Sequence, residues 1–511
     1  MTLVIHAACK LPRSLFFLSI FLLSLANAQA EDKRPNILWI FVEDLSPWFG
    51  CYGHEANKNH TPVLDGLAKR GVLFERAFTT APVCSASRSA IITGRYQTSN
   101  GTHQHRSSRS SEIPVPEAVR IHLPVGQKTL PELLRAAGYD TFNKGKDDYN
   151  FHYNRHDLYS WGTRQDYVVG QNGWQGNAAP ALRDWNKGMW QDQTDKNRPW
   201  FGQLMLWGGK AKDRHVPEAD RINPADVTLP AYYPDTPIQR KAWADHINAA
   251  RGTDRQVGEV LQRLEKDGLL DKTIIFFFSD HGNNSSLRHK QFCYEGGLHV
   301  PLIVAGPVTN AKTGTRRPEL VSALDISATT LALAGTKIPS YFEGNNLFAK
   351  DHQPRTYMIS ARDRCDYTID RIRSVRTDQF RYIQNSYPER PLLQPQYRDT
   401  WPITKDLKEQ KEKGTLTPYQ LSYWFESRPP EELYDLAKDP DQLHNLVTDP
   451  NYRDQYQKHR QILQNWMQKT GDQGQMAESL IQLEATFELW KDKPIFKDAP
   501  KNPEYSPFLN P

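Results

Sequence analysis

Three apolar runs, and the helical pattern between them, constrain the fold of this chain most strongly. Residues 36–42, 273–279 and 300–305 are almost continuously apolar, as expected for strands buried on both faces of a sheet. Between the first two runs, residues 242–265 repeat their apolar side chains with the period of a helix. Strands that alternate with helices predict an α/β fold with a mostly parallel central sheet flanked by helices.

The composition changes near residue 350. Residues 386–430 are rich in Pro, Tyr and charged side chains and show little periodicity, and a long polar helix is predicted over residues 450–469. We therefore predict a main α/β domain over residues 31–355 and a smaller C-terminal α+β subdomain over residues 356–511.

Residues 1–30 have the pattern of a secretory signal peptide. Lys10 and Arg13 supply the charged region before the apolar stretch of residues 15–25, and residues 28–30 supply a small-residue cleavage site. An uncleaved anchor is the alternative, but the stretch is too short to span a bilayer well. We expect an exported protein, periplasmic or secreted, with no membrane span in its mature form.

Charge and cysteine content exclude some function classes. Loss of the signal peptide removes two basic residues and lowers the formal net charge from +5 to +3, which is too weak to argue for nucleic acid as a partner. Four cysteines then remain, which is no disulfide framework for an exported chain and predicts buried free thiols. They are Cys51, Cys84, Cys293 and Cys365.

Cys84 opens a segment that predicts a short helix ending at Gly94. Arg88 follows four residues later, so the two side chains share one face of that helix. A thiol at a helix N-terminus lies where backbone N–H groups and the helix dipole favour negative charge, and the same place binds sulfate or phosphate. The segment predicts a reactive, anion-binding site.

Acidic pairs follow the first two apolar runs. Glu43-Asp44 comes directly after one run and Asp280-His281 after the other. Ligands of open α/β sheets bind outside the carboxyl ends of the strands, and three carboxylates with an imidazole there suit a hard cation. The alternative for each pair alone is the N-cap of a following helix.

Together these motifs resemble those of the type I sulfatases of the alkaline phosphatase superfamily, in particular the polysaccharide-active bacterial type. Cys84-x-Ala86-x-Arg88 is similar to the activation signature of that family, Cys-x-(Pro/Ala)-x-Arg. The resemblance extends from residues 34–37 to residues 432–436, nearly the whole mature chain. It implies an alkaline phosphatase-like fold in which the main domain is catalytic.

The resemblance also implies a modified residue and a metal. Cys84 would be oxidised to formylglycine (3-oxoalanine) by a formylglycine-generating enzyme or maturase and would then be the nucleophile, with Arg88 beside it. Ca²⁺ or Mg²⁺ would be held by residue 84 and the two acidic pairs. Glu43 stands where many members have Asp, and its longer arm predicts a weaker or outer ligand. The implied metal ligands are Glu43, Asp44, Cys84, Asp280 and His281.

Two lysines match sulfate-binding positions of the family. Lys290 lies four residues before Tyr294, the family's spacing for one of them, and Lys146 matches the lysine of a Gly-Lys-x-His segment. Asp148 stands where that histidine would be. The alternative for a single lysine is a solvated surface charge. As a pair they would offset charge on the sulfuryl and leaving oxygens.

The residue that protonates the leaving alcohol is left open. His103 and His105 follow the Cys84 helix, and either would contact formylglycine or sulfate, with His105 slightly ahead of His103. The alternative for both is a polar loop histidine. The family places a further histidine after a strand like residues 201–207. Lys210 is aligned with that role here, with His215 as the alternative.

Arg362 and Arg364 are candidates for substrate recognition. They flank an acid in a charged run that is usually a solvated face, but they fall where some sulfatases bring a C-terminal loop towards the substrate. Their guanidinium groups would grip a uronate or a second sulfate with paired hydrogen bonds.

These features predict an exported sulfatase that hydrolyses sulfate esters of a sulfated carbohydrate such as an ulvan-, carrageenan- or heparan-like chain. By resemblance, one hydroxyl of the hydrated aldehyde attacks sulfur and the other later expels sulfate. The alternatives are a phosphodiesterase or phosphonate hydrolase of the same superfamily, or a non-catalytic protein that binds sulfated glycans. An intact Cys84 motif disfavours the last.

Overall fold

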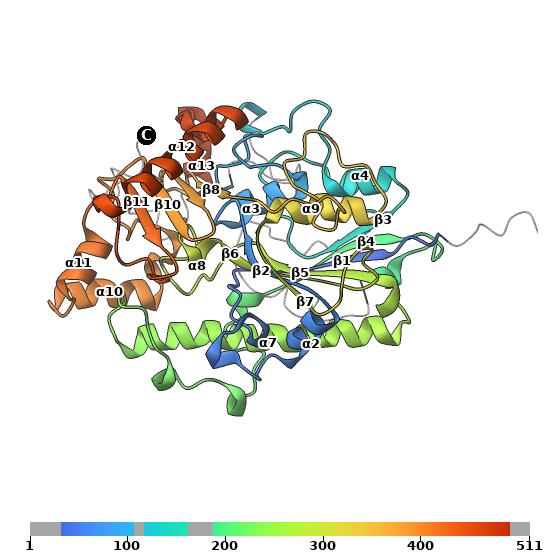
Figure 1. Ribbon diagram of the computed structural model, residues 1–511, viewed down its shortest axis with the longest axis horizontal. Coiled ribbons are helices and arrows are strands. Elements are labelled where there is room, and N and C mark those ends of the chain that lie inside the picture. Colours follow the sequence, from blue (N-terminus) through green and yellow to red (C-terminus); the bar gives the residue numbers. More distant parts are fainter. Residues whose placement is uncertain (1–31, 107–116, 162–186, 188, 491–511) are drawn as a thin grey trace, which may run out of the picture.

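The computed structural model describes residues 32–106, 117–161, 187 and 189–490, most of them arranged around two β-sheets (Figure 1). The expected signal peptide, residues 1–30, lies outside the described residues. In this described part of the chain, no helix combines the length and the apolar character that crossing a membrane requires.

The larger sheet has seven strands in the order β3-β4-β1-β5-β6-β2-β7. Strand β6 is antiparallel to both neighbours, and the other pairs are parallel. The predicted mostly parallel sheet is therefore confirmed, and the three apolar runs form β1, β5 and β6. The strands are β1 (Asn36–Val42), β2 (Gly71–Phe78), β3 (Asp140–Lys144), β4 (Trp200–Leu206), β5 (Thr273–Ser279), β6 (His299–Ala305) and β7 (Thr315–Ser322).

Alternate residues of the central strands enter two apolar layers, one on each face of the sheet. Trp39 and Phe276 belong to one layer, and their neighbours Leu38 and Phe277 belong to the other. Full burial of each such side chain contributes roughly 1.5–3 kcal/mol, which holds the helices on both faces. The first layer is covered by α3 (Cys84–Thr93), α4 (Leu130–Ala136) and α9 (Ala323–Leu333), and the second by α2 (Pro62–Arg70) and α7 (Pro237–Lys266), as Figure 1 shows. The helix predicted over residues 242–265 lies within α7.

The smaller sheet is antiparallel, with the strand order β11-β10-β9-β8. Helix α12 (Arg453–Thr470), the predicted long polar helix, packs Leu463 and Trp466 against Val375 and Tyr382 of this sheet. The strands are β8 (Met358–Arg362), β9 (Ile372–Arg376), β10 (Phe380–Asn385) and β11 (Glu431–Asp435). Shorter helices are α5 (Arg155–Leu158), α8 (Glu295–Leu298), α11 (Pro418–Phe425) and α13 (Leu480–Trp490).

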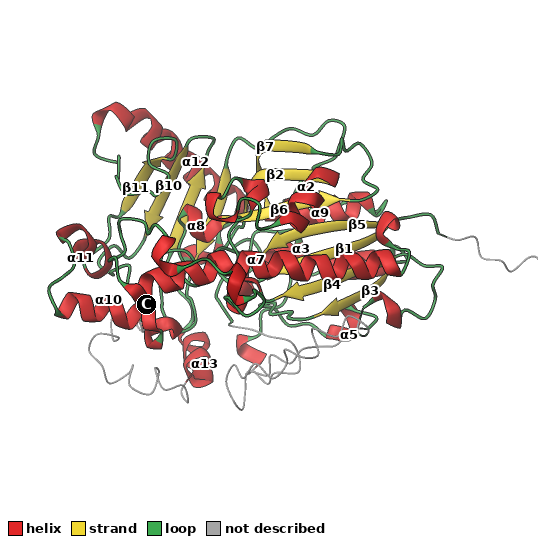
Figure 2. Ribbon diagram, turned by 90° about the horizontal axis from the view of Figure 1, so that it is seen from below, coloured by secondary structure: helices red, strands yellow, loops and turns green. Residues whose placement is uncertain are grey.

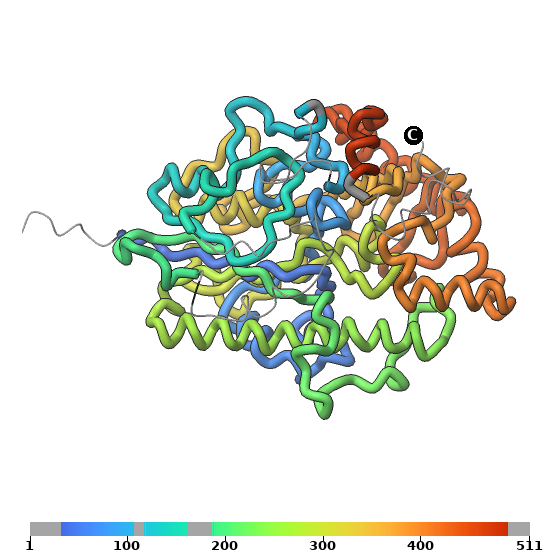
Figure 3. Tube along the Cα trace, turned by 180° about the vertical axis from the view of Figure 1, so that it is seen from behind, coloured from blue at the N-terminus to red at the C-terminus, as the bar shows by residue number. Residues whose placement is uncertain are grey.

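The two sheets lie beside each other and are joined by hydrogen bonds (Figure 2). The Ala361 N–H of β8 donates to Thr80 O, just past the end of β2, at 2.8 Å. Helix α10 (Pro402–Glu412) meets the start of α7 (Figure 3). There the Gln239 side chain donates to Ile403 O at 2.9 Å. The C-terminal region thus reaches the edge of the large sheet where the candidate site lies, while the predicted domain limits stay a prediction.

Two glycines offer a matched test of this packing. An added Cβ at Gly202 of β4 would lie 2.0 Å from the Phe142 ring, whereas an added Cβ at Gly66 of α2 would have no neighbour within 4 Å. We expect Gly202→Ala to lower the free energy of unfolding by about 1–3 kcal/mol. Gly66→Ala should raise it by up to about 1 kcal/mol, since alanine is the better helix former. Urea denaturation measures both, and equal effects would contradict the packing.

Candidate functional site

The two acidic pairs emerge side by side at the carboxyl edge of the large sheet. Strands β1 and β5 end in register, so Glu43 and Asp280 leave the sheet at the same point. The Asp44 N–H donates to Asp280 Oδ1 at 2.9 Å, and the His281 N–H donates to the same oxygen at 3.0 Å. Asp44 has a φ of 54°, a left-handed conformation that aspartate tolerates better than most residues. The turn after β1 is thereby fixed against the end of β5.

Helix α3 begins at Cys84, after β2 ends at the same edge. Val83 is the extended N-cap, and Gly94 ends the helix with a φ of 62°, as the sequence predicted. The Ser87 hydroxyl donates to Asp280 O at 2.6 Å. This bond holds the helix N-terminus, with its favourable field for negative charge, beside the end of β5.

Cys84 lies within a compact group of metal-binding side chains. Its Sγ is 3.3 Å from His281 Nε2 and 3.8 Å from Asp44 Oδ1. One donor atom from each of Asp44, Cys84, Asp280 and His281 lies within 4.8 Å of the other three, and all four residues are buried. Carboxylate oxygens suit Ca²⁺ or Mg²⁺, whereas a thiolate is a poor ligand for such hard cations and an imidazole nitrogen is a weaker one than oxygen. The two carboxylates therefore fit a hard cation, and the fit improves when residue 84 carries oxygen in place of sulfur.

Glu43 lies outside this group and binds three cationic side chains instead. Its Oε1 accepts from Arg88 at 3.2 Å and lies 2.7 Å from Lys146 Nζ. Its Oε2 lies 2.5 Å from Lys210 Nζ. The longer arm thus directs the carboxylate to these cations, and a place for Glu43 as a weaker or outer metal ligand stays a prediction.

Both predicted sulfate-binding lysines lie beside the acidic strand ends, and we call these acids, Cys84 and the cations around them the Cys84 cluster. Lys290 Nζ lies 3.1 Å from both oxygens of Asp44 and 3.4 Å from Cys84 Sγ. Lys146 Nζ lies between Glu43 and Asp148, 3.0 Å from the latter. Lys290 also faces the Tyr397 ring from the C-terminal region, 5.6 Å from its centroid.

Arg88 connects the helix to both acidic strand ends. Its Nε donates to Asp280 at 3.1 Å, and a terminal nitrogen donates to Lys146 O at 3.0 Å. The guanidinium group also lies 4.2 Å from the centroid of the Phe41 ring. Burial lowers the pKa of Arg88, but Asp280 and Glu43 raise it further, so the side chain stays charged.

The cations keep the buried acids ionised. Burial raises the pKa of Glu43 and of Asp44, but the neighbouring cations outweigh it and hold both pKa values below the ordinary range. Lys146 acts most strongly on Glu43, and Lys290 on Asp44.

The same field favours negative charge on residue 84. Burial raises the pKa of the Cys84 thiol, but Lys146 and Lys290 lower it to about 7. Burial lowers the pKa of His281, whereas Asp280 and Asp44 raise it to about 10. The position therefore stabilises an anion, and the carboxylates attract positive charge to His281.

The histidine candidates occupy different places. His105 is buried, with Nδ1 2.7 Å from the Ser85 hydroxyl and Nε2 3.4 Å from Asp366, and burial holds its pKa well below the ordinary range. Burial also lowers the pKa of His103, whose charged neighbours include Asp363. His215 lies beside Gly252 of α7. Of the two candidates for the leaving-group acid, Lys210 approaches the acidic strand ends. Its Nζ lies 4.0 Å from Asp44 Oδ2.

Arg362 and Arg364 are buried, so the charged run is not a solvated face. Arg362 pairs with Asp370 at 3.0 Å, and Arg364 pairs with Glu478 at 2.6 Å. Arg364 also donates to His105 O at 3.2 Å. Their contacts bind the C-terminal region together, and a role in substrate recognition stays a prediction.

Sequence reasoning missed Arg398, which organises the loop that carries Lys290. The guanidinium group is fully buried and donates to the backbone carbonyls of Asn284, Ser286 and Lys290 at 2.9–3.0 Å. Among the described residues, no carboxylate lies within ion-pair distance of it. Arg398 follows Lys290 by more than a hundred residues in a stretch without periodicity, so no sequence signal indicated the contact.

A second missed pair is Arg106 and Asp148. Arg106 donates to both oxygens of Asp148 at 3.2 Å, and Asp148 also contacts Lys146. Arg106 and Lys146 hold the pKa of this buried carboxyl well below its ordinary range, although burial alone would raise it. Asp148 thus fixes the lysine that also contacts Glu43. Its place in a Gly-Lys-x-His-like segment was visible in the sequence, but its arginine partner was not.

Comparisons with known proteins identify the family of this chain. A family model described as Sulfatase matches residues 35–336, more than half of the chain. The chain is 32% identical over 471 residues to an ulvan-active sulfatase of Formosa agariphila, covering 88% of this chain and 77% of that protein. It is 29% identical over 346 residues to N-acetylgalactosamine-6-sulfatase of Homo sapiens, covering 61% of this chain and 65% of that protein.

The fold is shared with solved structures at lower identity. The phosphonate monoester hydrolase of Agrobacterium radiobacter superposes with a TM-score of 0.61 at 18% identity, over 86% of this chain and 96% of that one. At this identity the likeness shows the fold alone.

Metal binding can be tested without reference to activity. Asp280→Asn removes a negative charge from the metal-binding group, and we expect it to weaken Ca²⁺ binding by more than about a hundredfold. Asp254→Asn is the matched control, because Asp254 is also buried but caps α2 through the Leu64 N–H at 2.7 Å. Calorimetric titration should find wild-type affinity in this control. Equal Ca²⁺ affinity in wild type and Asp280→Asn would exclude the site.

Proposed function

The chain belongs to the sulfatase family, a group of sulfuric ester hydrolases within the alkaline phosphatase superfamily, and on that premise we propose that it is an exported enzyme that removes sulfate from a sulfated carbohydrate. The observation that carries the proposal is the buried group around Cys84. It joins the helix N-terminus, the two acidic strand ends and the cations Arg88 and Lys290.

Residue 84 is the proposed nucleophile after a formylglycine-generating enzyme or maturase has converted Cys84 to formylglycine. That group, once hydrated, supplies an oxygen nucleophile where the chain encodes sulfur. The field of Lys146 and Lys290, which lowers the pKa of the thiol, would likewise stabilise negative charge on an oxygen at this position. The mismatch between a thiolate and a hard cation is a second argument for the conversion.

Asp44, Asp280 and His281 are the proposed metal ligands of the chain, together with residue 84. The cation, Ca²⁺ or Mg²⁺, would supply positive charge beside the sulfate oxygens. Arg88 forms ion pairs with both Asp280 and Glu43 and so fixes the position of the ligand Asp280. Glu43 is proposed as the anchor of the surrounding cations.

Lys290 and Lys146 are proposed to bind the sulfate group. Lys290 Nζ is 3.4 Å from Cys84 Sγ, so it lies beside the reacting position, and the pKa of both lysines is raised, which keeps them charged. Charge that develops on the sulfuryl oxygens would be offset by these ammonium groups without rearrangement.

Lys210 is proposed to give the proton to the leaving alcohol. Its ammonium group contacts Glu43, and its side chain is 10% exposed, against 0% for Lys146 and 4% for Lys290. This greater exposure supports its proposed place on the side of the leaving group. His105 is held between Ser85 and Asp366 as a neutral imidazole, and its proposed role is to fix the residue next to Cys84.

The proposed substrate class is a sulfated polysaccharide or its oligosaccharides. The ulvan-active relative and the human N-acetylgalactosamine-6-sulfatase are each named for action on a sulfated glycan. The expected export would bring the enzyme to such polymers. The shared fold with a phosphonate monoester hydrolase makes phosphodiester or phosphonate cleavage the second candidate.

Parallel assays separate these candidates. We expect the enzyme, co-produced with a maturase, to cleave an aryl sulfate faster than an aryl phosphate diester, and Cys84→Ala to lose sulfate release while melting as wild type does. Intact-mass analysis should find the Cys84 peptide lighter by about 18 Da, from replacement of S by O with loss of two hydrogens. Dominant phosphodiester turnover would contradict the sulfatase proposal. Sulfate release by Cys84→Ala would contradict the nucleophile.

Arg398 predicts a second kinetic effect. Arg398→Lys keeps the charge but cannot bridge the three carbonyls of the Lys290 loop, so kcat/KM for sulfate esters should fall about ten- to hundredfold. Because Lys290 binds the sulfate group, KM should carry much of the loss, and melting should change little.

The matched control is Arg355→Lys, another charge-conserving change, in an ion pair with Asp325. It should stay within about twofold of wild type. Equal kcat/KM in Arg398→Lys and wild type would contradict the positioning role.

A further inference from the structure

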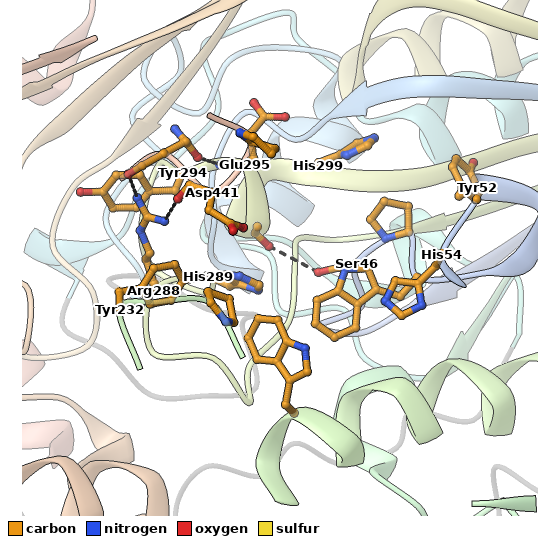
Figure 4. A pocket seen from close by; sticks show the side chains of 18 residues that line it. Ser46, Tyr52, His54, Tyr232, Arg288, His289, Tyr294, Glu295, His299 and Asp441 are labelled. Atoms are coloured by element: carbon orange, nitrogen blue, oxygen red, sulfur yellow. Dashed lines mark hydrogen bonds between the residues drawn. The ribbon is translucent and has the colours of Figure 1, made fainter. Parts of the chain in front are cut away.

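A half-open cavity of about 300 Å³ lies outside the cluster around Cys84 (Figure 4). It is formed by the loop after β1, the start of α7, the segment before β6 and residues 440–442. Ser46 lines it two residues after Asp44, and His289 lines it one residue before Lys290. The cavity therefore shares two backbone segments with the proposed active site.

Aromatic side chains form much of its wall. The Trp48 and Trp243 rings lie 4.9 Å apart, and the His54 ring stacks on Trp48 at 5.1 Å with an interplanar angle of 19°. Both tryptophans are partly exposed. Partly exposed, flat apolar faces beside a cavity offer a surface to the C–H faces of a ring-shaped ligand.

Buried polar atoms in the same wall lack partners within the described chain. His289 Nδ1 and Gln442 Nε2 have no hydrogen-bond partner among the described residues, although these residues are only 6% and 2% exposed. His54 Nδ1 likewise has no hydrogen-bond partner among the described residues. Such atoms cost stability unless a ligand or water satisfies them, and all three belong to residues that line this cavity.

The charges of Arg288 and Asp441 offset each other in the cavity. The Arg288 guanidinium group donates to the Asp441 and Gln442 carbonyls and lies over the Tyr294 ring at 4.0 Å, while its Nε has no hydrogen-bond partner among the described residues. Burial lowers the pKa of His289 to about 3, so its imidazole is neutral at pH 7. The exposed carboxylate of Asp441 is at the rim.

We propose that this cavity binds one uncharged sugar unit of the glycan, as a carbohydrate subsite separate from the sulfate-binding cluster. A pyranose ring has apolar C–H faces that pack on Trp48 and Trp243, and hydroxyl groups that both donate and accept. His289 and Gln442 carry the complementary polar atoms, which reach these hydroxyl groups when the side chains turn towards the cavity. The volume is at the small end of known ligand pockets. The inference rests on the proposed glycan substrate and extends it to an unsulfated unit.

The test is calorimetric titration with desulfated oligosaccharides from ulvan, carrageenan and heparan sulfate. At least one should bind the wild type, and Trp243→Ala should weaken that binding by about tenfold or more. Gln442→Ala, a smaller change, should also weaken it. Tyr419→Ala, a partly exposed aromatic residue of α11 outside the cavity, is the control and should bind as the wild type does.

Turnover of a small aryl sulfate distinguishes this inference from the proposed function. We expect all three variants to keep it within about twofold, since none of these residues belongs to the Cys84 cluster. Lack of binding by every desulfated oligosaccharide, or undiminished binding by Trp243→Ala and Gln442→Ala, would overturn the subsite and leave a cavity filled by water. If the wild type itself does not cleave the aryl sulfate, that result would instead reject the sulfatase proposal.

Discussion

The structure around Cys84 depends on a balance of buried charge. The carboxylates of Glu43, Asp44 and Asp280 follow the ends of two adjacent strands and are shielded from solvent. An isolated buried carboxylate costs several kcal/mol. Each is matched by a cation within hydrogen-bonding distance: Arg88, Lys146, Lys210 or Lys290. Removing one partner would leave its counterpart uncompensated, so the acids and cations form one interdependent unit.

The fold explains how residues so distant in sequence come to share this unit. Parallel strands deliver their carboxyl ends to one edge, and α3 is fixed there through the Ser87 bond to Asp280 O. The C-terminal region completes the arrangement from the other side, where Arg398 holds the loop of Lys290. The C-terminal region therefore contributes to the geometry of the site as well as to stability.

The sequence predicted the parts of the molecule that periodicity and local spacing determine. The apolar runs of β1 and β5, the helix from Cys84 to Gly94 and the acidic strand ends are all of this kind. The antiparallel direction of β6 was not predicted, because a buried run of apolar residues looks the same in either direction.

The supporting contacts of the site could not be predicted, because they depend on how loops without periodicity meet in space. Arg106 with Asp148 and Arg398 with the Lys290 loop join residues 42 and 108 positions apart. The sequence also could not distinguish Lys210 from His215, since both follow β4 in a segment without periodicity that would fix the direction of either side chain. The structure gives Lys210 its contact with Glu43.

We propose that the charge-balanced side chains hold a cation and sulfate around an oxygen-bearing residue 84. A crystal structure of the matured protein grown with Ca²⁺ and sulfate would test this arrangement. We expect one cation bound by Asp44, Asp280 and His281 together with an oxygen of residue 84, and a sulfate ion contacting Lys290 and Lys146. An unmodified Cys84 thiol in that matured protein, or a cation and sulfate bound away from these residues, would contradict it.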